Sequence, residues 1–134
     1  MGHPQAVTVH GLAQARAALA PGRPVTLLSA PGAALYAGCG WWRALVTQAL
    51  AGRTEAVPDI LDCADAPGRA LEALRIGQQA LILDPRAAGW AEVAATAAGL
   101  GATLLGARPP ALDLGDPRGA RALLKWLEGP AGQP

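Results

Sequence analysis

Short apolar runs alternate along this chain with longer segments of helical period, and this alternation constrains the fold more than any other feature. Five runs are predicted strands: residues 6–9, 24–28, 60–61 with their flanks, 80–83 and 102–105. The last three runs are continuously apolar, a pattern typical of strands that are covered on both faces of a sheet.

Between these runs, apolar residues recur three or four positions apart, as on one face of an α-helix. The five stripes are Leu12, Ala15 and Leu19; Leu35, Cys39, Trp42, Val46 and Ala49; Ala70, Leu71 and Leu74; Trp90, Val93, Ala94 and Ala97; and Ala120, Leu123, Leu124 and Leu127. Alternating strands and helices favour a parallel sheet with right-handed crossovers and helices on both faces. The predicted fold is an α/β three-layer sandwich with a mostly parallel five-stranded sheet, Rossmann-like or flavodoxin-like. The pattern leaves the strand order open.

The segment 108–114 breaks this rhythm. Pro109 and Pro110 end the fifth predicted strand, and an Ala-Leu-Asp-Leu stretch follows them. Proline donates no ladder hydrogen bond and is confined to edges and strand ends. We therefore expect an extended segment at the edge of the sheet, or one that reaches a partner chain.

The length of 134 residues predicts one domain, over residues 1–128, and a loose C-terminal tail over residues 129–134, which are rich in turn-formers. The 11 basic and 10 acidic residues nearly balance, so we expect no nucleic-acid partner. No apolar run reaches the roughly 18 residues that span a bilayer, and we expect no membrane partner either.

The N-terminal residues lack the basic flank and apolar core of a secretory signal, and two cysteines make no disulfide framework. We therefore expect a cytoplasmic protein. Ten of the eleven basic residues are Arg, which is typical of a GC-rich bacterial genome.

The candidate site lies at the carboxyl ends of the predicted strands, where open α/β sheets bind their ligands. The candidate ligand-binding residues in the loops there are Ser29, Gly32, Asp62, Cys63, Asp65 and Arg108. In this interpretation Arg108 supplies a cation, and the amides of the turn around Gly32 hold an oxyanion. The implied ligand is small and polar or anionic.

Asp62 and Cys63 allow two interpretations. A carboxylate at this edge is able to bind a ribose hydroxyl, orient a water or act as a general base. Alternatively, Asp62 bonds loop backbone and Cys63 is a small buried apolar residue. The second interpretation is favoured, because a free cysteine is most often a buried packing residue.

Three other aspartates are interpreted first as helix caps. Asp84 and Asp116 each precede a proline and a helical segment, which is a common helix start. Asp65, two residues before Pro67, has the same interpretation beside its candidate role in the site.

The stretch from Gly38 to Trp42 is unusual because it holds two glycines within a helical pattern. Cys39 falls on the apolar stripe, which predicts packing, and His3 and His10 supply no evident base for a catalytic thiol. No Cys/His pair has the close spacing of a metal site, so no metal is expected.

Trp41 and Trp42 are adjacent and must diverge by about 100° on a helix, so one is expected in the core and one at a boundary. Trp126 is also expected at a margin. An exposed Trp is typical of an interface and predicts a homodimer, although the chain's own loops are an equal alternative.

These observations favour a binding domain, dimeric, that holds a small ligand at the carboxyl edge. One alternative is a small enzyme that uses Asp62 or Cys63, for which no mechanism can be written; catalytic residues and cofactors stay unassigned. Another is a homodimeric structural or interaction protein.

Overall fold

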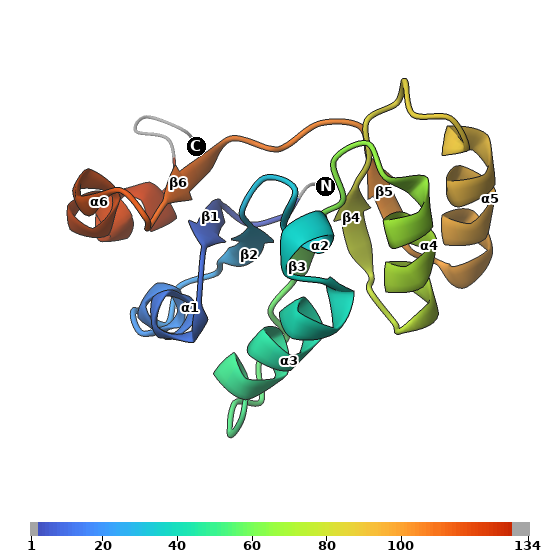
Figure 1. Cartoon of the computed structure of the whole chain (residues 1–134). Helices are drawn as coiled ribbons and strands as arrows, with labels where there is room; N and C mark the ends of the chain where they lie inside the picture. Colours follow the sequence, from blue (N-terminus) through green and yellow to red (C-terminus); the bar gives the residue numbers. More distant parts are fainter. Residues whose placement is uncertain (1–2, 130–134) are drawn as a thin grey trace.

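The computed structural model describes residues 3–129, and its six parallel strands form one sheet (Figure 1). The strands are β1 (Ala6–Val9), β2 (Thr26–Ser29), β3 (Asp59–Asp62), β4 (Ala80–Ile82), β5 (Thr103–Leu105) and β6 (Ala111–Asp113). Their order is β5-β4-β3-β2-β1-β6. Residues 130–134 of the predicted tail lie outside the described part of the chain.

The predicted α/β class, with a parallel sheet flanked by helices, is confirmed and is consistent with a Rossmann-like or flavodoxin-like sandwich. The sheet has six strands instead of five. The additional strand is β6, which lies at the edge beside β1, where an extended segment was expected.

The helices are α1 (Leu12–Leu19), α2 (Ala33–Tyr36), α3 (Cys39–Ala49), α4 (Pro67–Arg75), α5 (Trp90–Leu100) and α6 (Pro117–Leu127). The predicted stripe from Leu35 to Ala49 is divided between α2 and α3 because Gly38 has a φ of 95°. Glycine reaches this left-handed region without steric cost. Within residues 3–129, no helix is long and apolar enough to cross a membrane.

Helices line one face of the sheet, which we call the helix face. Buried residues of α1, α3, α4, α5 and α6 form a single core with side chains from the strands, among them Val7, Leu27, Leu61 and Leu81. From β1 to β5 the chain always moves to the next strand in the same direction, and right-handed crossovers of that kind put every helix on the same side. Helices on both faces would need an earlier reversal of strand order.

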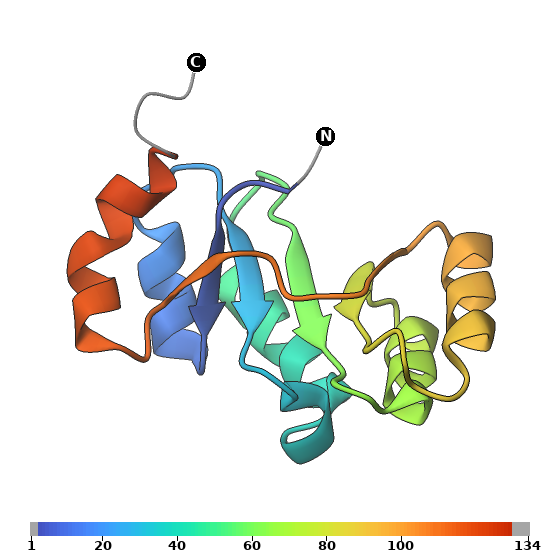
Figure 2. The same cartoon turned by 90° about the horizontal axis from the view of Figure 1, so that it is seen from above.

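The opposite face is covered by an extended segment of five residues, 106–110, which we call the strap. It leads from β5 across the sheet to β6, and Figure 2 shows it crossing in front of the strands. This strap face holds a second, smaller apolar cluster, with Ala6, Leu28, Ile60, Ala80 and Ile82 all buried. The strap therefore replaces the second layer of helices that was expected.

The central strand β3 pairs with β2 along one edge and with β4 along the other, through different residues. Asp59 and Ile60 are in register with β2, whereas Leu61 and Asp62 are in register with β4. The two halves of the sheet are thus joined through this one strand.

Candidate functional site

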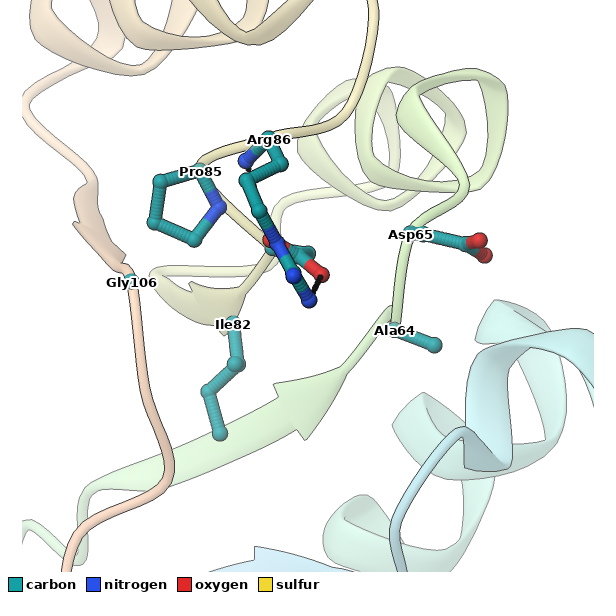
Figure 3. Close-up of a pocket in the computed structure, with 7 residues that line it drawn as sticks. Ala64, Asp65, Ile82, Pro85, Arg86 and Gly106 are labelled. Atoms are coloured by element: carbon teal, nitrogen blue, oxygen red, sulfur yellow. Dashed lines mark hydrogen bonds and ion pairs between the residues drawn. The ribbon is translucent and has the colours of Figure 1, made fainter.

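Neighbouring strands β4 and β5 send their outgoing loops to opposite faces of the sheet. The loop after β4 leads to α5 on the helix face, and the loop after β5 becomes the strap. Open α/β sheets bind ligands in the crevice that such a change of direction leaves at the carboxyl edge. A depression of about 630 Å³ lies there (Figure 3), lined by Ala64, Asp65, Ile82, Asp84, Pro85, Arg86 and Gly106. We call it the switch-point depression.

Asp84 and Arg86 form a two-pronged ion pair in this depression. Asp84 Oδ1 accepts from the Arg86 backbone N–H at 2.9 Å and from Nε at 3.2 Å, and Oδ2 accepts from Nη2 at 3.0 Å. These hydrogen bonds from Arg86 lower the pKa of Asp84. The Arg86 side chain is 90% exposed, so its remaining N–H groups face solvent.

Two backbone features also gather at the switch-point depression. Ala64 has a φ of 51°, a left-handed conformation that is uncommon for a residue other than glycine. Gly106 approaches the loop after β4 so closely that a Cβ there would lie 2.9 Å from Pro85 Cγ. Strained or tightly constrained backbone of this kind clusters at functional sites.

The capping predictions have different outcomes. Asp116 caps α6 and accepts the Arg118 N–H at 2.9 Å, as expected. Asp84 caps no helix, because α5 begins only at Trp90, after a turn that ends in a left-handed Gly89. Asp65 caps none either, since the cap of α4 is Ala66 and makes no side-chain bond.

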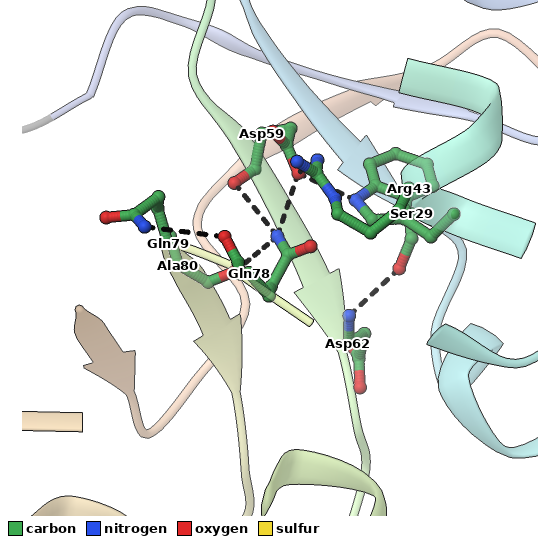
Figure 4. Close-up of polar contacts among 9 residues, drawn as sticks. Ser29, Arg43, Asp59, Asp62, Gln78, Gln79 and Ala80 are labelled. Carbon is green, nitrogen blue, oxygen red and sulfur yellow. Dashed lines mark hydrogen bonds and ion pairs between the residues drawn. The ribbon is translucent and has the colours of Figure 1, made fainter. Parts of the chain in front are cut away.

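Ser29, Asp62 and Arg108 come together at the carboxyl edge, but their polar groups bond to one another. Arg108 Nη1 donates to Asp62 Oδ2 at 2.8 Å and to the Ser29 carbonyl at 3.0 Å, while Nη2 donates to Thr8 Oγ1 at 3.1 Å. The Asp62 N–H donates to Ser29 Oγ at 2.9 Å (Figure 4), and Asp62 Oδ1 accepts from the Ala64 N–H. Arg108 thus ties the strap to β1, β2 and β3.

The other three candidate residues take no part in this hydrogen-bond network. Cys63 is fully buried, and burial, followed by the neighbouring Cys39 and Asp62, raises the pKa of its thiol to about 12. Gly32 has a φ of 68° before the four-residue helix α2. Asp65 is exposed and is the one candidate residue that lines the switch-point depression.

The structure places Cys39 and the tryptophans as the stripe patterns predict. Cys39 is buried, and burial together with Glu72 raises the pKa of its thiol. Trp42 is fully buried while Trp41 is 37% exposed. Trp126 is half-buried, and its Nε1 donates to the Ala6 carbonyl at 2.8 Å.

Sequence reasoning missed a pair at the ends of β1 and β6. His10 Nε2 and Asp113 Oδ1 are 2.7 Å apart, and the Gly115 N–H donates to the same oxygen at 2.8 Å. Burial alone would raise the pKa of Asp113, but these hydrogen bonds outweigh it and the pKa is lowered. The sequence predicted an edge segment over residues 108–114, which contains Asp113. It did not predict which strand that segment would join, so the contact with His10 could not be foreseen.

Within the described residues, no group of three or more His, Cys, Asp and Glu side chains is arranged to hold a metal ion. Comparison of the sequence with protein-family models and with curated proteins finds no match. The fold and the depression together define a class: an open α/β protein with a hollow of mixed charged and apolar lining at the carboxyl edge of its sheet.

Proposed function

We propose that this protein is a binding domain that holds a small polar ligand in the switch-point depression. The observation that carries the proposal is the position of this hollow, which has charged and apolar lining residues and lies where the outgoing loops of β4 and β5 diverge to opposite faces. Ala64 and the 84–89 turn support it, because natural sequences break local rules mainly at functional or strained sites.

The side chains in the depression offer both kinds of hydrogen-bonding group. Asp65 is an exposed acceptor, and Arg86 offers the N–H groups that Asp84 does not use. Ile82 and Pro85 add apolar surface to the lining. A ligand with an anionic group would compete with Asp84 for Arg86, whereas a hydroxyl group would need no such exchange.

The enzyme alternative receives less support from the geometry. Both carboxylate oxygens of Asp62 accept hydrogen bonds within the protein. Cys63 is buried with its pKa raised to about 12, so its thiolate, the reactive form, is scarce at neutral pH.

A homodimer is a second candidate, favoured by apolar side chains on the neighbouring helices α2 and α3. Leu35 is 44% exposed, Tyr36 69% and Trp41 37%. Aromatic residues of this kind are enriched at interfaces. Sedimentation equilibrium tests this candidate. A dimer that associates even weakly would be detected at a protein concentration of about 100 µM. A monomer at every concentration up to that value would contradict the homodimer.

Native mass spectrometry of the protein, purified without additives and then screened against small polar compounds, tests the ligand proposal. A bound mass that is lost on denaturation is expected in the wild type and weakened in Asp65→Asn and Arg86→Gln. The matched control is Arg118→Gln, because Arg118 belongs to a second Asp-Pro-Arg segment, at α6, and is 84% exposed. Equal binding by all three variants would contradict the proposed site.

A further inference from the structure

A second polar cluster lies at the amino end of β3, away from the switch-point depression (Figure 4). One oxygen, Asp59 Oδ2, accepts from Trp42 Nε1 at 2.8 Å, Arg43 Nη2 at 2.6 Å and Gln78 Nε2 at 2.8 Å. The donors come from α3 and from the segment that leads into β4. We call these four residues the Asp59 cluster.

Two buried atoms of the Asp59 cluster have no hydrogen-bond partner among the described residues: Gln78 Oε1 and Arg43 Nε. Gln78 is 1% exposed. Its amide orientation is fixed, because Nε2 also donates to the Ala80 carbonyl at 2.9 Å and a flipped amide would set oxygen against two acceptors. The unpartnered oxygen is therefore a property of the site.

The two atoms are of opposite kind, since Arg43 Nε–H donates and Gln78 Oε1 accepts. Arg43 and Gln78 both donate a hydrogen bond to Asp59 Oδ2. If either side chain moved toward the other to form a direct bond, it would weaken its hydrogen bond to Asp59. A buried donor and acceptor left unsatisfied lower stability, and internal water is the usual partner for such groups.

We infer that the Asp59 cluster is a binding site for one internal water molecule, which accepts from Arg43 Nε–H and donates to Gln78 Oε1. The water completes a network that links α3, β3 and the entry to β4. Asp59 is the first residue of β3, the strand that lies between β2 and β4, so the water would stabilise the start of this strand and its contacts with α3 and β4.

A crystal structure of the wild-type protein at about 1.5 Å, where ordered waters are routinely visible, tests this inference directly. The expected result is one water within about 3.2 Å of both Arg43 Nε and Gln78 Oε1, the range of a hydrogen bond. A direct bond between the two atoms, or an ordered site without water, would overturn the inference.

Water-to-protein Overhauser spectra give a second test in solution. Cross-peaks from water to Arg43 Hε and to the Gln78 side-chain amide are expected, with none to the backbone amide of Leu28, which is buried in the sheet. Arg43→Lys keeps a cation for Asp59 but removes the Nε donor, and is expected to abolish the Gln78 cross-peak. A Gln78 cross-peak of unchanged intensity in a folded Arg43→Lys variant would contradict the assigned partners.

Discussion

At the residue scale, the polar groups of the carboxyl edge divide into those that hold the fold and those that are open to a ligand. Asp62 and Arg108 bond to each other and to backbone groups, so they hold the fold. From the sequence alone they were ligand-binding candidates in the same way as Asp65. The sequence predicted that they would meet, because carboxyl ends of parallel strands share an edge. It could not predict that Arg108 would reach back to Asp62, because that contact depends on the path of the strap.

Asp62→Ala should therefore lower the free energy of unfolding by about 1–3 kcal/mol, because it leaves the partly buried Arg108 guanidinium without its carboxylate partner and the Ala64 N–H without its acceptor. Asp65→Ala is the control: it removes an exposed carboxylate from the same loop and should change stability by less than about 0.5 kcal/mol. Urea melts of both variants measure this. Equal effects would show that the Asp62–Arg108 pair does not hold the strap.

The raised pKa of the buried Cys63 thiol predicts that the free energy of unfolding falls at alkaline pH. Its pKa in the folded state, about 12, is raised above the ordinary 9.0, so the unfolded chain releases this proton first. The stabilising contribution is complete below pH 9 and is lost as pH rises toward 12, with a slope of at most about 1.4 kcal/mol per pH unit.

Urea melts between pH 8 and 11 measure this slope, and Cys63→Ala provides the comparison. The variant is expected to have a shallower decline than the wild type, because every other titrating group is unchanged. Parallel declines in the two proteins would contradict the burial of Cys63.

At the scale of elements, periodicity predicted most helices and strands. A prediction was wrong where tertiary packing overrode a local helix-start signal. The Asp-Pro-Arg sequence occurs twice, at 84–86 and 116–118, yet only the second starts a helix. The first is followed by Gly89 in a left-handed conformation, where a Cβ would lie 3.3 Å from Pro67. Tertiary packing against the start of α4 thus overrides a helix-start signal that is identical in sequence.

The contact of α6 with β6 depends on a glycine in the helix. A Cβ at Gly119 would collide with the carbonyl oxygen of Asp113, so Gly119→Ala should destabilise the protein by about 2–3 kcal/mol. Gly99→Ala is the matched change in α5, where a Cβ meets nothing within 4 Å, and should stabilise by about 0.5–1 kcal/mol. Thermal melts of the two variants should shift in opposite directions. A shift in the same direction would contradict the close packing of α6 on β6.

At the scale of the whole molecule, the α/β class follows from the alternation of strands and helices, but the layers do not. Strand order depends on the direction in which each crossover turns. The apolar strand segments, such as those around Ile60 and Leu81, do not specify that direction. The strap was visible only as Pro109 and Pro110, which were predicted to end the fifth strand, whereas β5 already ends at Leu105. Nothing local showed that the strap would cross the sheet to β6. The switch-point depression follows from that crossing, and so does the pairing of His10 with Asp113.

The central claim is that a small polar ligand binds where the loops of β4 and β5 diverge. The most direct measurement is a ¹H–¹⁵N correlation spectrum of the labelled protein, recorded with and without each compound found to bind in the mass-spectrometric screen. We expect the largest shifts at the amides of Ala64, Asp65, Arg86 and Gly106, with the amides around Arg118 unchanged. Shifts confined to any other part of the molecule would contradict the claim.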